Sequence, residues 1–196
     1  MHLAFDIFTG MGVAAAVGIR PFLPALVVGA LAAAGAEIHF KGTDYSFLQS
    51  VPFLLAMVVL VIVLAYVDRR FGAAAEERRP VFVALALVSA ALGALLFAGS
   101  LARGHYAAWP GLIAGVLCAA IGLLATRPLF ARVRARLDPE AAGAVPLYAE
   151  GAAVLLGALS VVAPPVGLIG LLLLAWLLVA GRRREDQKFA GLRILR

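Results

Sequence analysis

Charged residues are scarce in this sequence. Asp, Glu, Lys and Arg make up 14% of its 196 residues, whereas about a quarter is usual for a soluble domain. Hydrophobic residues make up 64%, and the mean hydropathy is +1.01. Several apolar stretches approach the ~20 residues that cross a bilayer as a helix. The composition therefore excludes an ordinary soluble domain and predicts an all-α, polytopic integral membrane helix bundle.

Cysteines and known catalytic patterns are also lacking. Cys118 is the one cysteine, and it lies in an apolar run, which excludes an intrachain disulfide and offers no metal-ligand spacing. His39 and His105 have no cluster of acids nearby, so no metal site is expected. The sequence contains no His-Glu-x-x-His, no Gly-x-Ser-x-Gly and no P-loop. We therefore expect neither an enzyme nor a bound cofactor.

Negative charge is the scarcer sign, since 17 Lys and Arg outnumber 11 Asp and Glu to give a net charge of +6. The cations cluster just beyond apolar stretches, so we expect them to meet anionic lipid headgroups rather than nucleic acid. By the positive-inside rule, the arginine-rich segments are expected on the cytoplasmic side of a bacterial inner membrane, and loop 37–46 outside. These segments are the loops 68–80 and 127–143 and a basic tail, 181–196, which follows a single transmembrane domain, 1–180.

Three full spans are predicted, together with two segments that prolines break. The full spans are expected at about 47–67, 81–102 and 111–126, and the broken segments are 5–36 and 144–180. Each half of a broken segment is roughly 22 Å of helix, which is short of the ~30 Å hydrocarbon core. The first broken segment is therefore either a long kinked span or a re-entrant hairpin, and the second is expected to be a hairpin.

Two surface features are predicted around the third span. Residues 127–137 alternate apolar and arginine positions in the pattern of a short basic amphipathic helix that lies on the membrane surface. Within the span itself, Gly111, Gly115 and Gly122 form a small-residue stripe. Such stripes allow helices to approach closely, so we expect this one to join copies of the chain in a homo-oligomer.

The first break lies at residues 18–24, Gly-Ile-Arg-Pro-Phe-Leu-Pro. Pro21 removes a backbone donor and pushes Arg20 out of the helical region, and Pro24 follows closely. A charge at membrane depth costs at least ~2.5–3.5 kcal/mol and usually faces the bundle interior or a polar cavity. Three roles for Arg20 stay open. It is an anion site beside the restarting helix, a structural arginine that pairs with Glu150 or caps loose carbonyls, or a side chain that snorkels to the headgroups.

The second broken segment carries Tyr148 and Glu150 near its start and breaks at Pro164. Glu150 is open to three interpretations: the acidic partner of Arg20, a proton-carrying carboxylate, or an interfacial acid near the first helical turn. Asp6, near the start of the chain, is expected to be solvated. Two broken segments at opposite ends of a chain are the usual sequence pointer to a transporter site.

The residues at 18–24, within a first segment rich in glycine and alanine, resemble a family of small bacterial multi-pass membrane proteins known only as a domain of unknown function. The Gly-x-x-x-x-Leu-Pro core and the later break at Ala163 and Pro164 are similar to that family's pattern. The resemblance covers nearly the whole chain. It implies a fold class and no established activity.

These observations favour a small transporter-like or lipid-handling protein that binds a small anionic substrate or an anionic lipid headgroup near Arg20. The alternative is an accessory or structural membrane subunit without transport activity, in which the break only shapes the bundle. The candidate residues of the ligand or ion pathway are Arg20, Pro21, Pro24, Tyr148, Glu150 and Pro164.

Overall fold

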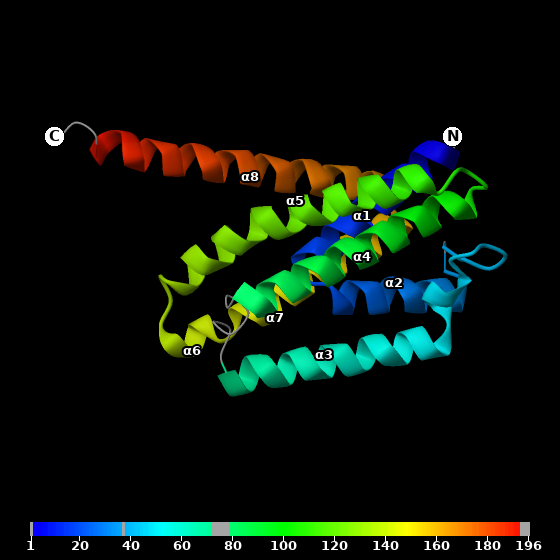
Figure 1. Ribbon diagram of the computed structural model, residues 1–196, viewed down its shortest axis with the longest axis horizontal. Helices are drawn as coiled ribbons and strands as arrows, with labels where there is room; N and C mark the ends of the chain where they lie inside the picture. Colours follow the sequence, from blue (N-terminus) through cyan, green and yellow to red (C-terminus); the bar gives the residue numbers. More distant parts are fainter. Residues whose placement is uncertain (1, 37, 72–78, 193–196) are drawn as a thin grey trace.

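The computed structural model describes residues 2–36, 38–71 and 79–192, and this part of the chain is helical and contains no β-strand. The helices lie roughly along one long axis (Figure 1). In chain order they are α1 (His2–Ile19), α2 (Phe22–Ala34), the short 3-10 helix η1 (Ser46–Gln49), α3 (Val51–Phe71), α4 (Arg79–Arg103), α5 (Trp109–Arg134), α6 (Pro139–Ala142), α7 (Val145–Val162) and α8 (Pro164–Leu192).

Helix α1 is the centre of the bundle. It packs against α4, α5, α7 and α8, and every residue from 12 to 18 is buried. Most of these residues are glycine or alanine, whose small side chains allow four neighbouring backbones to come close. One such close approach is at Gly18, where an added Cβ would lie 2.8 Å from the backbone carbonyl carbon of Ala119 in α5.

The chain reverses between α1 and α2. The last hydrogen bond of α1 runs from the Arg20 N–H to the Ala16 carbonyl at 3.1 Å, and Pro21 has no N–H to continue the ladder. Helix α2 then starts at Phe22 and returns toward the end of the bundle that holds the N-terminus (Figure 1). Pro24 is the third residue of α2, and the first N–H groups of a helix have no intrahelical acceptor, so the proline costs no helix hydrogen bond.

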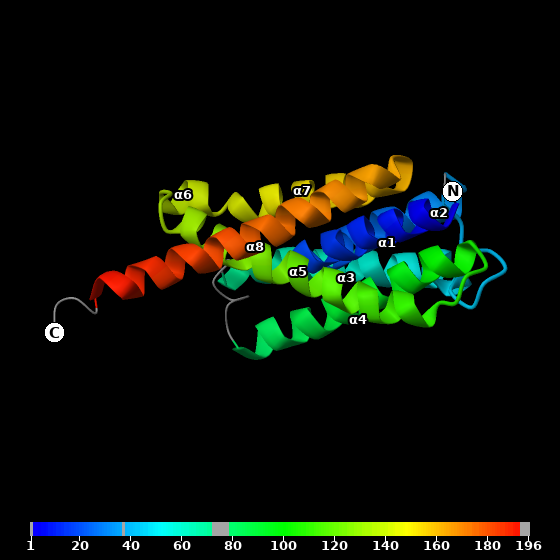
Figure 2. The same cartoon turned by 90° about the horizontal axis from the view of Figure 1, so that it is seen from above.

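The outer elements place large apolar side chains on the surface. Helix α3 packs against α2 and η1, and its opposite face exposes Leu55 and Ile62. Helices α7 and α8 form a hairpin whose turn is Ala163, at the same end as the N-terminus (Figure 2). Exposed apolar side chains continue along α8, including Leu172 and Trp176. In water these faces would favour aggregation, whereas hydrocarbon chains solvate them well.

In the described part of the chain, four helices are long and apolar enough to cross a membrane. They are Pro80–Arg103, Trp109–Arg134, Val145–Val162 and Pro164–Arg182. The protein therefore has the helices of a multi-pass membrane protein, in agreement with the predicted all-α membrane bundle. The helices differ in detail from the expected three spans and two broken segments.

The second broken segment, 144–180, is two span-length helices rather than two short halves. Pro164 is the first residue of α8, where an N–H would have no intrahelical acceptor, so its absence loses no hydrogen bond. Ala163 alone therefore separates α7 from α8. Helix α8 also runs past residue 180 to Leu192, so the segment expected as a tail begins as helix. The expected span at 47–67 instead gives a shorter apolar helix, Val51–Val67.

The prediction of a separate surface helix at 127–137 is wrong. Helix α5 continues through Pro128 to Arg134, so these arginines belong to the last turns of a long helix. An interior proline removes one hydrogen bond and strains one turn, and packing against neighbouring helices outweighs that cost here. Side chains on both sides of the proline bond nearby carbonyls: Thr126 Oγ1 donates to the Gly122 oxygen at 2.7 Å, and Arg132 Nε donates to the Pro128 oxygen at 3.0 Å.

The glycine stripe of α5 lies at helix contacts within this chain, and the homo-oligomer expected through it stays a prediction. Gly111 and Gly115 are buried against α4, and Gly122 is buried against α1. The stripe packs against α4 and α1 of the same chain, because these helices are themselves rich in small residues where they cross α5. No sequence pattern distinguishes an internal crossing from one between copies.

Asp6 was expected to be solvated, and this expectation is wrong as well. Its side chain is 3% exposed and forms an ion pair with Arg103, at the end of α4. The Ser100 hydroxyl donates to the Asp6 carbonyl oxygen at 3.1 Å. A Cβ at Gly104 would lie 2.5 Å from an Asp6 carboxylate oxygen, so glycine makes room for the pair.

Candidate functional site

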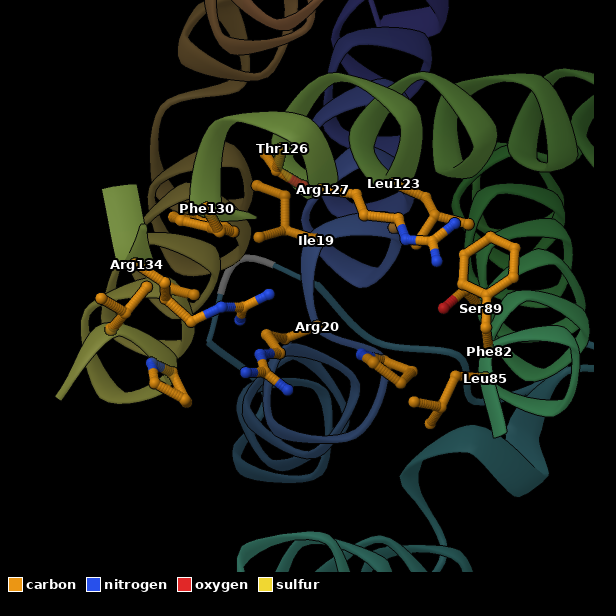
Figure 3. A pocket seen from close by; sticks show the side chains of 15 residues that line it. Ile19, Arg20, Phe82, Leu85, Ser89, Leu123, Thr126, Arg127, Phe130 and Arg134 are labelled. Carbon is orange, nitrogen blue, oxygen red and sulfur yellow. The ribbon is translucent and has the colours of Figure 1, made fainter. Parts of the chain in front are cut away.

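A cavity of about 80 Å³ lies where the α1–α2 reversal meets α4, α5 and the start of α7. A water molecule needs about 10–15 Å³, so the cavity holds a few waters or one group the size of a phosphate. We call it the three-arginine pocket, because Arg20, Arg127 and Arg134 all line it (Figure 3). Its other lining residues are Gly18, Ile19, Pro21, Phe82, Leu85, Ser89, Leu123, Thr126, Phe130, Val145, Pro146 and Ala149.

Arg20 enters the pocket from the α1–α2 reversal. It is 7% exposed, which is low for a residue with a permanent charge. Helix α2 begins two residues later, and no side chain caps its N-terminus. The first N–H groups of a helix have no intrahelical partner and carry the positive end of the helix dipole. The reversal therefore places a guanidinium and a helix N-terminus within two residues of each other.

One face of α5 supplies the other two arginines. Leu123, Arg127, Phe130 and Arg134 follow one another at spacings of four, three and four, which places them on one side of a helix. The Arg127 guanidinium carbon lies 3.7 Å from the centre of the Phe82 ring in α4. This cation–π contact holds Arg127, which is otherwise exposed, at the edge of the pocket.

Ser89 adds a buried polar group. It lies on α4, is 2% exposed and lines the pocket. Its hydroxyl forms no hydrogen bond with any residue that the structure describes, although serines within helices commonly bond the carbonyl four residues earlier. A buried polar group without a partner costs about 1–3 kcal/mol. The pocket therefore contains a hydroxyl suited to a polar ligand or a water molecule.

The electrostatics of the pocket favour an anion. Arginine stays charged at every physiological pH and donates five N–H groups in a planar fork that matches phosphate and carboxylate. Of the described lining residues, three are arginines and none is Asp or Glu. The other polar side chains of the described lining are the hydroxyls of Ser89 and Thr126.

The structure brings together only part of the predicted pathway. Arg20 and Pro21 line the pocket, whereas Pro24 is buried in α2 against α7. Tyr148 is 76% exposed on α7 and does not line the pocket. Pro164 lies at the α7–α8 turn, toward the other end of the bundle (Figure 2).

Glu150 does not act as the partner of Arg20. It is half-buried on α7, next to the pocket-lining Ala149, and is itself outside the lining. No ion pair joins it to Arg20 in the structure. The structure therefore does not support a pair with Glu150, and the other structural role of Arg20, capping loose carbonyls, stays open.

Sequence reasoning missed Arg127, Arg134 and Ser89 as pocket residues. A signal for the two arginines was present, because they are seven residues apart with Phe130 between them. That spacing marks one helical face, but only if the helix continues through Pro128. Ser89 had no comparable signal, since a serine in an apolar helix is common.

Comparison with known proteins gives a family and no activity. No curated protein and no solved structure matches the chain. One family model, described as a domain of unknown function (DUF4126), matches residues 7–184, which include every lining residue of the three-arginine pocket. The match agrees with the resemblance seen at residues 18–24, and the chain belongs to this family.

Proposed function

We propose that the protein binds an anionic group in the three-arginine pocket and acts as a small transporter-like or lipid-handling protein of the bacterial inner membrane. One observation carries the proposal: three arginines from two separate parts of the chain line one small cavity. An anion that binds in this cavity is attracted by all three positive charges. The unpartnered Ser89 hydroxyl supports the same conclusion.

We further propose that α1 and α2 form a re-entrant hairpin. Apolar helices of this length, Leu3–Ile19 and Phe22–Ala34, are shorter than the four span-length helices. A chain reversal at membrane depth is tolerated where it is buried in protein or lines a polar cavity, and this one lines the pocket. On this view the anion binds near the cytoplasmic face, where the α5 arginines also lie, and the C-terminus is cytoplasmic.

A thermal-shift experiment in detergent tests the proposal. The probes are inorganic phosphate, glycerol 3-phosphate, succinate and phosphatidylglycerol, with phosphatidylcholine as the uncharged comparison. A ligand at 100 times its Kd stabilises the folded state by about 2.7 kcal/mol. We expect at least one anion to raise Tm in the wild type. Arg20→Gln should abolish that rise, and Arg20→Lys should keep part of it, because lysine retains the charge and loses the fork.

The matched control is Arg70→Gln. Arg70 is exposed at the end of α3 and lines none of the described cavities, so this variant should respond to the anion as the wild type does. An equal loss in Arg70→Gln would mean that net charge, and not the pocket, governs the response.

The alternative is an accessory or structural subunit, and the low exposure of Arg20 favours it. In that case the pocket arginines stabilise the helix reversal and bind no ligand. Arg20→Gln would then lower Tm strongly, and no anion would change Tm in either protein. That pair of results would overturn the proposed function.

A further inference from the structure

A second basic feature lies between α5 and α8, outside the three-arginine pocket. Helices α5 and α8 diverge toward the end of the bundle that carries α6 (Figure 1). Two cavities, of about 430 and 200 Å³, lie between them. We call these two cavities together the α5–α8 crevice. Its lining residues are Leu124, Arg127, Pro128, Leu129, Ala131, Arg132, Val133, Arg136, Trp176, Leu177, Leu178, Ala180, Gly181 and Arg182.

The crevice combines apolar walls with a ring of cations. Arg127 and Arg132 lie on α5, Arg136 lies two residues beyond its end, and Arg182 lies on α8. All four are exposed, and within the described chain none forms an ion pair with a carboxylate. Arg132 uses Nε to bond the Pro128 carbonyl, which leaves its terminal N–H groups available. The chain thus presents four cations around an apolar surface and no described acid to balance them.

The depth of these arginines matches a lipid headgroup. Trp109 starts α5 and is of the type found in interfacial aromatic belts. Arg127 follows 18 residues later, which is about 27 Å of helix and close to the ~30 Å thickness of the hydrocarbon core. Arg127 and the arginines beyond it therefore reach the headgroup level of the opposite leaflet.

We propose that the α5–α8 crevice is a binding site for an anionic phospholipid. The phosphate lies on Arg132 and Arg136, and an acyl chain lies along Leu177 and past Trp176, four residues that line one and the same cavity. Charge complementarity and the apolar walls together select a molecule that is both anionic and aliphatic. Arg127 lines both the crevice and the three-arginine pocket, so the two features adjoin. This inference deepens the proposed function by assigning its anion to the class of lipid phosphates.

Tryptophan fluorescence tests the assignment, because the chain has two tryptophans and one of them lines the crevice. Trp109→Phe leaves Trp176 as the sole tryptophan. Trp109 is 66% exposed, so we expect the fold to tolerate phenylalanine at position 109. The variant is reconstituted into phosphatidylcholine vesicles with increasing phosphatidylglycerol, and one lipid at a time carries brominated chains. Brominated chains quench a tryptophan that they touch, so the quenching measures the relative affinity of the two lipids at Trp176.

We expect phosphatidylglycerol to be preferred at Trp176 by about fivefold or more, since one basic residue near an anionic surface contributes about that factor. Arg132→Gln with Arg136→Gln should bring the preference close to one, because these two arginines line the same cavity as Trp176. Arg70→Gln should keep the preference of the parent. A preference near one in the parent, or an unchanged preference in the double variant, would overturn the assignment.

Two further arms separate the occupants and the two sites. Excess inorganic phosphate should leave the lipid preference unchanged, and a loss of the preference would identify a soluble anion as the occupant and overturn the lipid assignment. Arg20→Gln alters the pocket alone and should leave the preference at Trp176 intact, whereas its loss would show that the crevice is no separate site. If the crevice variants leave the lipid preference unchanged while Arg20→Gln still abolishes the anion-induced rise in Tm, the crevice assignment is wrong and the proposed function stands.

Discussion

Gly115 and Gly151 provide a matched test of the helix packing, because they are the seventh residues of α5 and α7. A Cβ at Gly115 would lie 2.7 Å from Ala94 Cα and 2.7 Å from the Gly93 carbonyl carbon, whereas a Cβ at Gly151 would meet nothing within 4 Å. Both obstacles are backbone atoms of α4, which cannot rotate aside. Ordinary contact begins at 3.4 Å, and the Gly93 carbonyl oxygen is nearer still, so alanine at position 115 must push the two helices apart by at least about 0.7 Å (3.4 − 2.7).

The same substitution should therefore have opposite effects at the two positions. Gly→Ala in a helix interior gains up to ~1 kcal/mol in helix propensity, and this gain is common to both positions. At Gly115 the added methyl also overpacks a tight contact, which costs about 1–3 kcal/mol. We expect Gly151→Ala to leave the free energy of unfolding unchanged or raised. The free energy of unfolding of Gly115→Ala should be about 1–3 kcal/mol lower than that of Gly151→Ala.

Reversible unfolding in mixed micelles, followed by circular dichroism, measures this difference. Helices persist in the unfolded state in detergent and reduce the propensity gain, but they do so for both variants, so the difference survives. Equal stabilities of Gly115→Ala and Gly151→Ala would refute the packing of α4 against α5. A stabilised Gly115→Ala would refute it more strongly.

Three more predictions follow from single features of the structure. Asp6→Asn and Arg103→Gln should each destabilise the fold by up to about 3–5 kcal/mol, because each strands a partly buried charge, and the double variant should lose less than the sum in the same unfolding assay. Ser89→Ala should keep or raise Tm and should weaken anion binding roughly 10- to 100-fold in the thermal-shift titration, since a hydrogen bond to a charged group is worth about 1.5–3 kcal/mol. A membrane-impermeant thiol reagent applied to intact cells should label Thr43→Cys and not Gly143→Cys, and the reverse pattern would invert the proposed topology.

The local consequences of proline were predictable from the sequence. The helix ends at Arg20 and Ala163 both follow from a missing N–H and a restricted preceding residue, which are properties of two adjacent residues. Whether the chain kinks or reverses at Pro21 was left open by the sequence. Pro128 shows where this argument stops. The same local rule predicts a helix end there, and the structure continues the helix. Whether one strained turn ends a helix depends on the packing of its neighbours, which no local pattern contains.

The partners of buried groups could not be predicted from the sequence for a related reason. Asp6 and Arg103 are 97 residues apart, and nothing in either neighbourhood indicates the other. The glycines of α5 likewise indicate that another helix packs closely against α5, but they do not indicate that the partners are α4 and α1. With one sequence, composition and periodicity determine which surfaces are buried, whereas the pairing of those surfaces is decided by the complete bundle.

The position of the three-arginine pocket follows from helix lengths. Helix α1 ends at Ile19, whereas α4 and α5 extend beyond that point toward α6 (Figures 1 and 2). A central helix that stops short leaves a volume between its neighbours, and protein interiors tolerate little empty space. Long side chains with polar ends fill it from the surrounding elements, among them Arg20 and Arg134. The reversal at Pro21 therefore does more than place one arginine, because it creates the space into which the arginines of α5 extend.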